Sequence, residues 1–484
     1  MPGEPSPRRG YGIHTSLLRS ACGNDSLRLS CMGVGDGCHT GAVRRPPPGK
    51  RGAFLLARLV EVGGRGVKVR RLGGDRAGEI RLTRFLRNDA VSVAEMVAEA
   101  AARTSARCAS RDVLVVQDTT VVRPQGGGGD YLHAALALDE ADGAVLGLVD
   151  GRFLHRSSGR RALRRAAPVE EKESFRWLQG ADAAASVCAG AARITVVSDR
   201  EGDIYEAFAL RPQGVDLLVR AAQDRSLQDR GLEDSVLDEG GRAFAALDAL
   251  PEAGRADLDL PAGPGRARRT ARLALRFCTL ALARPARGFC AGLPDAGEMN
   301  LVDVREVAPP PGQPAVHWRL LTTRPARDAG EAWAVAGLYR RRWAIEQLFR
   351  TLKTKGFDVE ALKIEDPAPR DKLVAAALVA AVAVQQLVHA RDGGPGPLRP
   401  CTDAFEPGDL PLIEKYCARL EGRTARQKNP HPRGSLAYAA WVCARLGGWT
   451  GYYGKPGPVV MLAGWLEIQS AKRALAVMGG KADV

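Results

Sequence analysis

Several features that mark familiar protein classes are missing from this 484-residue chain. None of its ten cysteines forms a C-x-x-C pair, and Cys31 and Cys38-His39 have no second ligand pair at zinc-finger spacing. The opening MPGEPSPRRG leads into no apolar core, and the one long apolar run, residues 373–388, is interrupted by two adjacent glutamines. We therefore expect a cytoplasmic protein with free thiols, in which residues 373–388 form a packed interior helix rather than a membrane span.

Negative charge is also in short supply. The chain has 70 Lys and Arg against 55 Asp and Glu, which gives a formal net charge of +15 and an isoelectric point of about 9.6. This balance favours an anionic partner, with nucleic acid ahead of an acidic membrane surface. A basic composition without functional meaning is the alternative. The run GGGG has no following G-K-[ST], so a phosphate-binding loop of that type is not expected.

Changes in sequence pattern divide the chain into four regions. Residues 1–50 are rich in Gly, Pro and Arg without periodicity and predict an irregular or disordered segment. Residues 51–110 predict short helices with basic residues, which form either a DNA-binding region or a solvated face. Residues 111–371 alternate buried strands with helices and include a β-rich insertion at about 224–316. Residues 372–484 predict helices.

Two buried strands of the third region each lead to an aspartate. VLVVQDTTVV predicts an apolar strand that ends in Asp118, and RITVVSD predicts a second strand that ends in Asp199. If the two strands are adjacent in a parallel or mixed sheet, both carboxylates emerge side by side. The alternative for each is an aspartate that only caps a turn. Asp203, three residues before Glu206, predicts a helix cap rather than a ligand.

A polar stripe follows within the segment LYRRRWAIEQLFRTLKTKGF. At 100° per residue, five of its side chains share an arc of about 80° on one helix. These are Tyr339, Arg342, Glu346, Arg350 and Lys353. The opposite face is apolar and carries Ile345, Leu348 and Leu352. The pattern predicts one amphipathic helix that presents a carboxylate among three cations and a phenol.

Three carboxylates from two strands and one helix are a chemically sensible metal site. Asp118, Asp199 and Glu346 supply the oxygen ligands that Mg²⁺ prefers, and two such ions about 3.5–4 Å apart support phosphodiester chemistry. One ion activates a water or a 3′-hydroxyl, and the other stabilises the leaving oxygen. The alternative for Glu346 is an ion pair with Arg342 or Arg350 on its own helix.

Three motifs together resemble the cut-and-paste DDE transposases of bacterial insertion sequences. They are QDTT at 117–120, SDREGDIYE at 198–206 and Y-x2-R-x3-E-x6-K at 339–353. The resemblance is to the hairpin-forming subgroup with the Y-R-E-K signature. It implies an α/β fold, with an RNase H-like catalytic core that contains a β-rich insertion and is flanked by N-terminal and C-terminal helical regions. It further implies Asp118, Asp199 and Glu346 as the catalytic and metal-binding triad.

The resemblance also implies DNA-binding residues and partners. The residues are Tyr339, Arg342, Arg350, Lys353, Trp318 and Arg220. Those of the stripe would hold a phosphate near the transposon end. Trp318 would stack on a base displaced during hairpin formation. The alternative for Trp318 is an aromatic side chain of the hydrophobic core. The implied cofactor is a pair of Mg²⁺ ions, for which Mn²⁺ can substitute. The implied partner is double-stranded DNA, both transposon ends and target.

The implied function is metal-dependent cleavage and strand transfer of an insertion sequence through a hairpin intermediate. The resemblance predicts a homodimer when two ends are synapsed, with residues 372–484 contributing to dimerisation, and a location at the nucleoid through DNA. Residues 1–50 depart from the helical end-recognition region of that family. Two other hypotheses therefore stay open: a DNA-binding relic or regulator derived from a transposase, and a non-specific metal-dependent nuclease.

Overall fold

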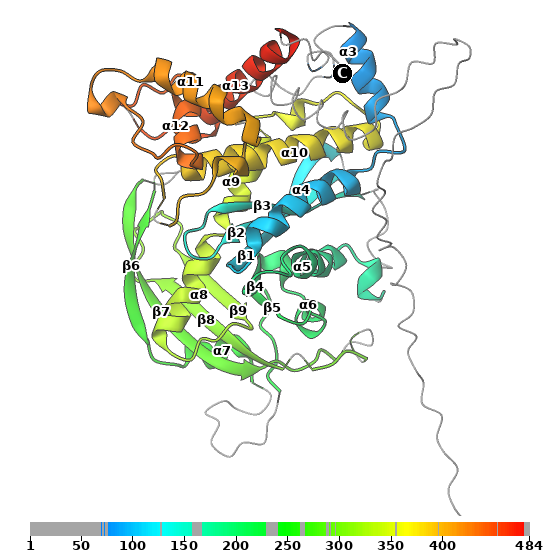
Figure 1. Ribbon diagram of the computed structural model, residues 1–484. Coiled ribbons are helices and arrows are strands. Elements are labelled where there is room, and N and C mark those ends of the chain that lie inside the picture. Colours follow the sequence, from blue (N-terminus) through cyan, green and yellow to red (C-terminus); the bar gives the residue numbers. More distant parts are fainter. Residues whose placement is uncertain are drawn as a thin grey trace, which may run out of the picture. The chain divides into compact units, whose positions relative to one another are not determined.

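The apolar runs of the sequence assemble into a mixed β-sheet, whose nine strands have the order β3-β2-β1-β4-β5-β9-β8-β7-β6. The computed structural model (Figure 1) describes residues 69, 72, 76–125, 128–156, 167–228, 241–261, 267–286, 290, 292–295, 297–353, 356–394, 396–452 and 454–478. The segment expected to be irregular, residues 1–50, lies outside this range, as does most of the following stretch to residue 75. All described residues belong to one compact unit.

The strands fall into a meander, a parallel pair and an antiparallel extension. Their bounds are β1 (Asp112–Gln125), β2 (Gly128–Asp139), β3 (Val145–Arg156), β4 (Arg193–Ser198), β5 (Val215–Arg220), β6 (Gly254–Leu260), β7 (Arg269–Ala281), β8 (Glu298–Glu306) and β9 (His317–Thr322). The first three strands pair antiparallel, and β4 runs parallel to both β1 and β5. The two aspartate-bearing strands are therefore adjacent and parallel, which is the condition under which their carboxylates emerge side by side.

Strand β1 is longer than the sequence suggested. The expectation that it ends in Asp118 is wrong, because β1 continues to Gln125. Its antiparallel partner β2 continues to pair with it beyond the apolar run, from Asp118 opposite Ala134 to Gln125 opposite Gly128. The parallel partner β4 stops much earlier, at Ser198. Asp118 therefore lies within β1 but just beyond the reach of β4, where one edge of the strand becomes free.

Helices cover both faces of the sheet (Figure 1). Their bounds are α3 (Arg76–Leu86), α4 (Val93–Cys108), α5 (Phe175–Val187), α6 (Tyr205–Ala209), α7 (Ala243–Asp248), α8 (Ala329–Arg340), α9 (Trp343–Leu352), α10 (Pro367–Ala390), α11 (Leu410–Leu420), α12 (Leu436–Leu446) and α13 (Pro458–Met478). Because side chains alternate along a strand, Leu114 and Val116 join the core formed with α9 and α10, whereas Val113 and Val115 join the core formed with α5 and α6.

The polar stripe lies on two consecutive helices rather than one. Helix α8 ends at Arg340 and α9 begins at Trp343, and the junction is closed by tighter bonds, from the N–H groups of Arg341 and Arg342 to carbonyl oxygens three residues earlier. The expectation of a single helix is wrong in this respect. The expected apolar face is confirmed, because Ile345, Leu348 and Leu352 are fully buried.

Helix α10 supports α9 from behind. It contacts α9 directly, and Gln385 donates to the Thr351 hydroxyl at 2.6 Å and to the Gln347 carbonyl at 3.3 Å. Among the described residues α10 is also the one helix long and apolar enough to cross a membrane, yet 72% of its most apolar window is buried inside the protein. Its packing agrees with the interior helix expected from the sequence. The expected domain boundary after residue 371 falls within this continuous helix.

The insertion extends the same sheet instead of forming a separate one. Strands β6, β7 and β8 lie within residues 224–316, and β8 pairs with β9, which in turn pairs with β5 of the central sheet. The helical elements α10 to α13 gather at the other end of this unit (Figure 1). The mixed α/β architecture expected from the sequence is confirmed at this level.

Candidate active site

Strand register brings the two aspartates to the same level of the sheet. The parallel pair β1–β4 runs to Val116 opposite Val197. Two residues further along each strand, this register places Asp118 level with Asp199. Asp199 follows the last residue of β4 and caps the short 3₁₀ helix η3 (Arg200–Gly202), because its side chain accepts a hydrogen bond from the Glu201 N–H at 2.9 Å. Asp118 accepts from the Thr119 N–H at 2.7 Å.

Arg342 joins the sheet to the stripe. Its Nη1 donates to Asp118 Oδ2 at 2.9 Å, and its Nη2 donates to Glu346 Oε1 at 2.6 Å. The guanidinium therefore lies between two of the three predicted carboxylates and partly neutralises them. The ion pair of Glu346 with Arg342, which the sequence left as an alternative role, is present. Helix α9 packs against β1, and this contact places Glu346 beside the strand.

The acids interact strongly enough to perturb the pKa of Asp118. Its pKa is raised from 3.8 to about 6, first by burial and then by the charge of Asp199, with a smaller contribution from Glu346, while the Thr119 N–H and Arg342 act in the opposite direction. A carboxyl group with such a pKa is poised between its two protonation states near neutral pH. The residues named by the sequence thus form one electrostatically coupled group.

The donor set is suited to a hard divalent cation, although it is not a ready-made metal cage. No group of three His, Cys, Asp or Glu side chains close enough to hold a metal ion occurs in the described part of the chain. The pKa of Asp118 is nevertheless raised by burial and, after that, by the nearby carboxylates Asp199 and Glu346, and carboxylate oxygens are the ligands that Mg²⁺ prefers. Arg342 supplies that positive charge in the present arrangement. The residues therefore fit a cation that competes with the guanidinium for the same oxygens.

A second group of predicted residues lies beside the acids. The rings of Trp318 and Tyr339 meet edge to face with centroids 5.8 Å apart, and the Arg342 guanidinium lies 5.8 Å from the centre of the Tyr339 ring. Burial raises the pKa of the Tyr339 phenol, which Arg342 and Arg220 counteract. Tyr339 is buried, whereas Trp318 keeps a partly exposed edge and packs against the core. Both roles named for Trp318 therefore remain open.

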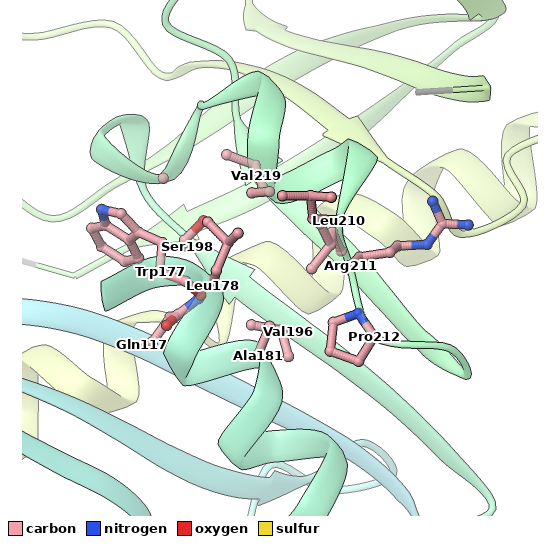
Figure 2. Close-up of a pocket in the computed structure, with 13 residues that line it drawn as sticks. Gln117, Trp177, Leu178, Ala181, Val196, Ser198, Leu210, Arg211, Pro212 and Val219 are labelled. Carbon is pink, nitrogen blue, oxygen red and sulfur yellow. The ribbon is translucent and has the colours of Figure 1, made fainter. Parts of the chain in front are cut away.

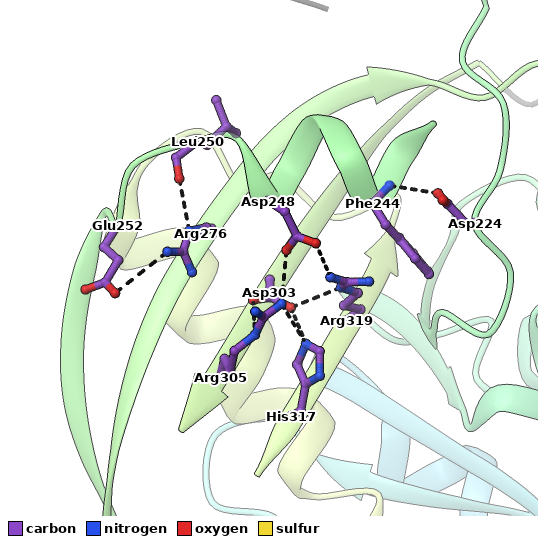
Figure 3. Close-up of polar contacts among 10 residues, drawn as sticks. All are labelled: Asp224, Phe244, Asp248, Leu250, Glu252, Arg276, Asp303, Arg305, His317 and Arg319. Carbon is purple, nitrogen blue, oxygen red and sulfur yellow. Dashed lines mark hydrogen bonds and ion pairs between the residues drawn. The ribbon is translucent and has the colours of Figure 1, made fainter. Parts of the chain in front are cut away.

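Strand β9 is anchored from the face opposite Trp318 (Figure 3). His317 and Arg319 point to that face, where His317 Nε2 lies 2.7 Å from Asp303 Oδ1 and Arg319 donates to Asp248 Oδ2 at 2.6 Å. Although burial raises the pKa of Asp303, His317 and the neighbouring arginines lower it overall. Arg220 Nη2 donates to the His317 carbonyl at 2.9 Å. In this structure Arg220 thus holds the backbone of β9, next to Trp318.

The remaining predicted cations lie further along α9. Arg350 is exposed, makes no ion pair within the described residues, and follows Glu346 by one helical turn, about 6 Å along the axis. Lys353 caps the end of the helix and forms an ion pair with Glu360 at 2.9 Å. The structure therefore brings Tyr339, Arg342 and Glu346 to the aspartates, while Arg350 and Lys353 extend the same face away from them.

Two residues near the site were not assigned by sequence reasoning. Trp343 directly follows Arg342 and is 55% exposed, which is unusual for an indole. Arg176, in the segment KESFRW at 172–177, is buried on α5 and binds residues on both aspartate-bearing segments. The signal for Arg176 was its position at the start of an otherwise apolar helix. Its partners could not be read from the sequence.

Asp203 does not cap a helix, so that expectation is wrong. Helix α6 begins after Ile204 and has no side-chain cap. The Asp203 carboxylate is buried and accepts from the N–H groups of Ala222 and Gln223 at 2.7 and 2.8 Å, and it pairs with Arg225 at 2.5 Å. These bonds tie the segment after β5 to the loop that follows Asp199. Its hydrogen bonds and ion pair give Asp203 a structural role, which fits the expectation that it is not a metal ligand.

A small cavity lies on the other face of the sheet from the acids. Gln117, Trp177 and Ser198 lie at one side of it and Arg211 and Pro212 at the other (Figure 2). Its volume of about 10 Å³ is near the minimum for one water molecule, so it cannot hold an organic substrate. The chemistry of the site therefore belongs to the open face where α9 meets β1.

Comparison with known protein families gives a match to part of the chain. Residues 207–382 match a family model described as the transposase DDE domain. The matched stretch contains Trp318, Glu346 and the rest of the stripe, and it begins after Asp118 and Asp199. The match supports a relationship with the DDE transposases, a family whose activity is DNA strand cleavage and transfer and whose partner is DNA.

Proposed function

We propose that this protein is a transposase that cuts and joins DNA at the coupled group Asp118, Asp199 and Glu346. The observation that carries the proposal is the level placement of the two aspartates at the edge between β1 and β4, with Glu346 linked to the same group through Arg342. The family match covers Glu346 and the stripe around it. The match supports the Glu346 part of the proposal, and the strand geometry supports the Asp118 and Asp199 part.

The proposed reaction is cut-and-paste transposition through a hairpin, on an RNase H-like core. Water attack nicks the transposon end, and the freed 3′-hydroxyl attacks the opposite strand to give a hairpin. A second water opens the hairpin and releases the 3′-hydroxyl again, which then attacks the target DNA. Divalent cations held by Asp118, Asp199 and Glu346, Mg²⁺ or Mn²⁺, would activate the attacking oxygen and stabilise the leaving one. The carboxylates are assigned this role because each supplies two oxygen ligands, and because the charges of Asp199 and Glu346 contribute to the raised pKa of Asp118.

Other residues of the site are assigned to DNA. Arg342 is buried beside the acids and can donate two parallel hydrogen bonds to a phosphate, a geometry that a lysine lacks. Arg350 offers an exposed cation one turn further along the same helix face. Trp318 offers the partly exposed ring on which a displaced base could stack. The proposed partners are transposon ends and target DNA, with a homodimer in the synapsed state and a cytoplasmic, nucleoid-associated location.

Two other functions use the same surface. A non-specific nuclease would need the acids but no end recognition, and a DNA-binding relic would need the cations but no acids. The pKa of Asp118, raised to about 6 by burial and by two neighbouring carboxylates, favours a working acidic site over a relic. End recognition would separate the nuclease from the transposase.

The proposed function is tested with a DNA end carrying the inverted repeat that borders the gene. The parent protein should nick this end when Mg²⁺ is added, whereas Asp118→Asn, Asp199→Asn and Glu346→Gln should each lower the rate by at least about 10³-fold. Cleavage of a scrambled end at the same rate would favour the nuclease. Parent-level cutting by the three variants would show that the acids are wrongly assigned.

A further inference from the structure

Each of the two aspartates is held by a backbone N–H that follows it closely. The Thr119 N–H donates to Asp118 at 2.7 Å, and the Glu201 N–H donates to Asp199 at 2.9 Å. These two donors belong to different elements, β1 and η3, and are 82 residues apart in the sequence. The register of β1 and β4 ends at Val116 and Val197, so beyond that point a link between Thr119 and Glu201 adds a constraint on the spacing of the two carboxylates.

Arg176 makes that connection. Its Nε donates to the Thr119 hydroxyl at 3.0 Å, and its Nη2 pairs with Glu201 Oε2 at 2.5 Å. Its Nη1 donates to the Glu173 carbonyl at 2.8 Å, so that all three nitrogens are bonded. The Arg176 side chain is 6% exposed, and its guanidinium does not contact either aspartate in the contacts described. It binds the side chains of the two residues whose backbones hold the carboxylates.

A second chain of hydrogen bonds fixes the other neighbour of Asp118. The Thr119 hydroxyl lies 2.9 Å from His133 Nδ1, and His133 Nε2 lies 3.2 Å from Gln117 Oε1. Gln117 then donates to the Trp177 carbonyl at 3.3 Å, so this series of hydrogen bonds ends on α5, next to Arg176. Burial, with the nearby positive charges of two arginines, lowers the pKa of His133 to about 3, so the ring is neutral and donates through Nε2 alone.

The network uses properties that only arginine supplies at position 176. A planar guanidinium donates in three directions at once, whereas a lysine ammonium at this depth has no fixed orientation. The path is also closely packed, because a Cβ atom on Gly180 would come within 2.1 Å of Gln117 Oε1. Tight packing and complete hydrogen bonding hold a rigid geometry, as the neighbours of metal-ligating residues commonly do.

We propose that Arg176 is a positioning residue, which sets the spacing of Asp118 and Asp199 for divalent cations by joining Thr119 on β1 to Glu201 in η3. The inference rests on the proposed function, since it concerns the same carboxylates. It gives a role to Arg176, Thr119 and Glu201, to which the sequence motifs assigned none and which lie before the family match begins at residue 207. Arg176 touches neither the cation nor DNA in this proposal.

The experiment measures Mn²⁺ binding to the full-length protein without DNA, by the loss of the free-ion signal in electron paramagnetic resonance. The ions that Asp118→Asn fails to bind define the site. Arg176→Met keeps the unbranched apolar part of the side chain but removes its donors, and it should weaken this binding about 10- to 100-fold. Glu201→Ala, in which the changed side chain is largely exposed, should weaken it in the same direction.

Thr119 provides the test that separates positioning from simple stability. Thr119→Ser keeps the hydroxyl that accepts from Arg176 and should bind Mn²⁺ like the parent. Thr119→Val keeps the shape but removes the hydroxyl, and it should bind as weakly as Arg176→Met. The matched control is Arg399→Met, because Arg399 is also largely buried and paired with a carboxylate, Asp139, but near the other end of the β1–β2 pair.

The outcomes distinguish this inference from the function on which it rests. If Asp118→Asn binds the same number of Mn²⁺ ions as the parent, the proposed metal site itself is wrong. If Asp118→Asn removes binding while Arg176→Met keeps parent affinity, only the positioning role is overturned. Equal losses in Thr119→Ser and Thr119→Val, or a loss in Arg399→Met as large as that in Arg176→Met, would also overturn it.

Discussion

Asp118 should make the metal-free protein less stable at neutral pH than at acidic pH. Its pKa is raised from 3.8 to about 6 in the folded protein, chiefly by burial and then by Asp199. Between those two values the folded state binds more protons than the unfolded state, so the free energy of unfolding falls as pH rises. Above about pH 6 the loss is complete. Asp118→Asn removes the titrating group and should abolish this part of the pH dependence.

The size of the effect follows from the pKa difference. A shift of about two units at 1.36 kcal/mol per unit corresponds to about 3 kcal/mol. The Asp118 side chain is 18% exposed, and asparagine binds Arg342 less strongly than a carboxylate does, so the gain on substitution should be smaller. We expect Asp118→Asn to be about 1–3 kcal/mol more stable than the parent at pH 7.5, and nearly equal to it at pH 4.

The assay is chemical unfolding at a series of pH values in EDTA, followed by tryptophan fluorescence. Asp89→Asn serves as the control, because Asp89 is an exposed carboxylate in a turn and its replacement should change stability by less than about 0.5 kcal/mol. Addition of Mg²⁺ should then stabilise the parent and leave Asp118→Asn unchanged. An Asp118→Asn protein that is less stable than the parent at pH 7.5 would refute the reasoning, since the carboxylate would then be favourably ionised.

Two further predictions concern DNA. Trp318→Ala should nick a transposon end at the parent rate but form the hairpin at least about 10-fold more slowly, because base stacking on an aromatic ring contributes about 1–3 kcal/mol. Gel analysis of the nicked and hairpin products measures both rates. An equal loss of both steps would contradict the stacking role. Arg350→Ala should weaken DNA binding about equally for all sequences and reduce the slope of log K against log salt by about one. Fluorescence anisotropy across a salt series measures the slope, and an unchanged slope would show that Arg350 contacts no phosphate.

Periodicity predicted the parts of the fold that burial determines. The apolar runs at 113–122 and 193–198 became β1 and β4, and they are adjacent and parallel. The buried face of α9 also followed from spacing alone. The end of β1 did not, because pairing with β2 continues wherever two backbones remain aligned, whatever side chains they carry. The break between α8 and α9 contains neither glycine nor proline, so no local signal marked it.

Long-range pairing of charges was beyond sequence reasoning. The spacing of Asp203 and Glu206 fits a helix cap, yet the carboxylate binds Arg225 and two backbone N–H groups after β5. Both arrangements satisfy the carboxylate, and only the fold decides between them. Arg176 poses the same difficulty, because its partners Thr119 and Glu201 become neighbours only when α5 packs on the sheet.

Arg342 links the two halves of the proposed function through competition. Its two terminal nitrogens bind Asp118 and Glu346, so the same atoms are not free for a phosphate. A divalent cation on those carboxylates would weaken both ion pairs and release the guanidinium, since a carboxylate oxygen shared with a doubly charged ion attracts a third positive charge less. Cation binding and phosphate binding by Arg342 should therefore be positively coupled, and by linkage DNA should raise the cation affinity by the same factor. Arg342→Gln should increase the affinity for Mn²⁺ in the absence of DNA. In this variant the Mn²⁺ affinity should also no longer depend on DNA. A loss of Mn²⁺ affinity would instead show that Arg342 supports the cation site rather than competing with it.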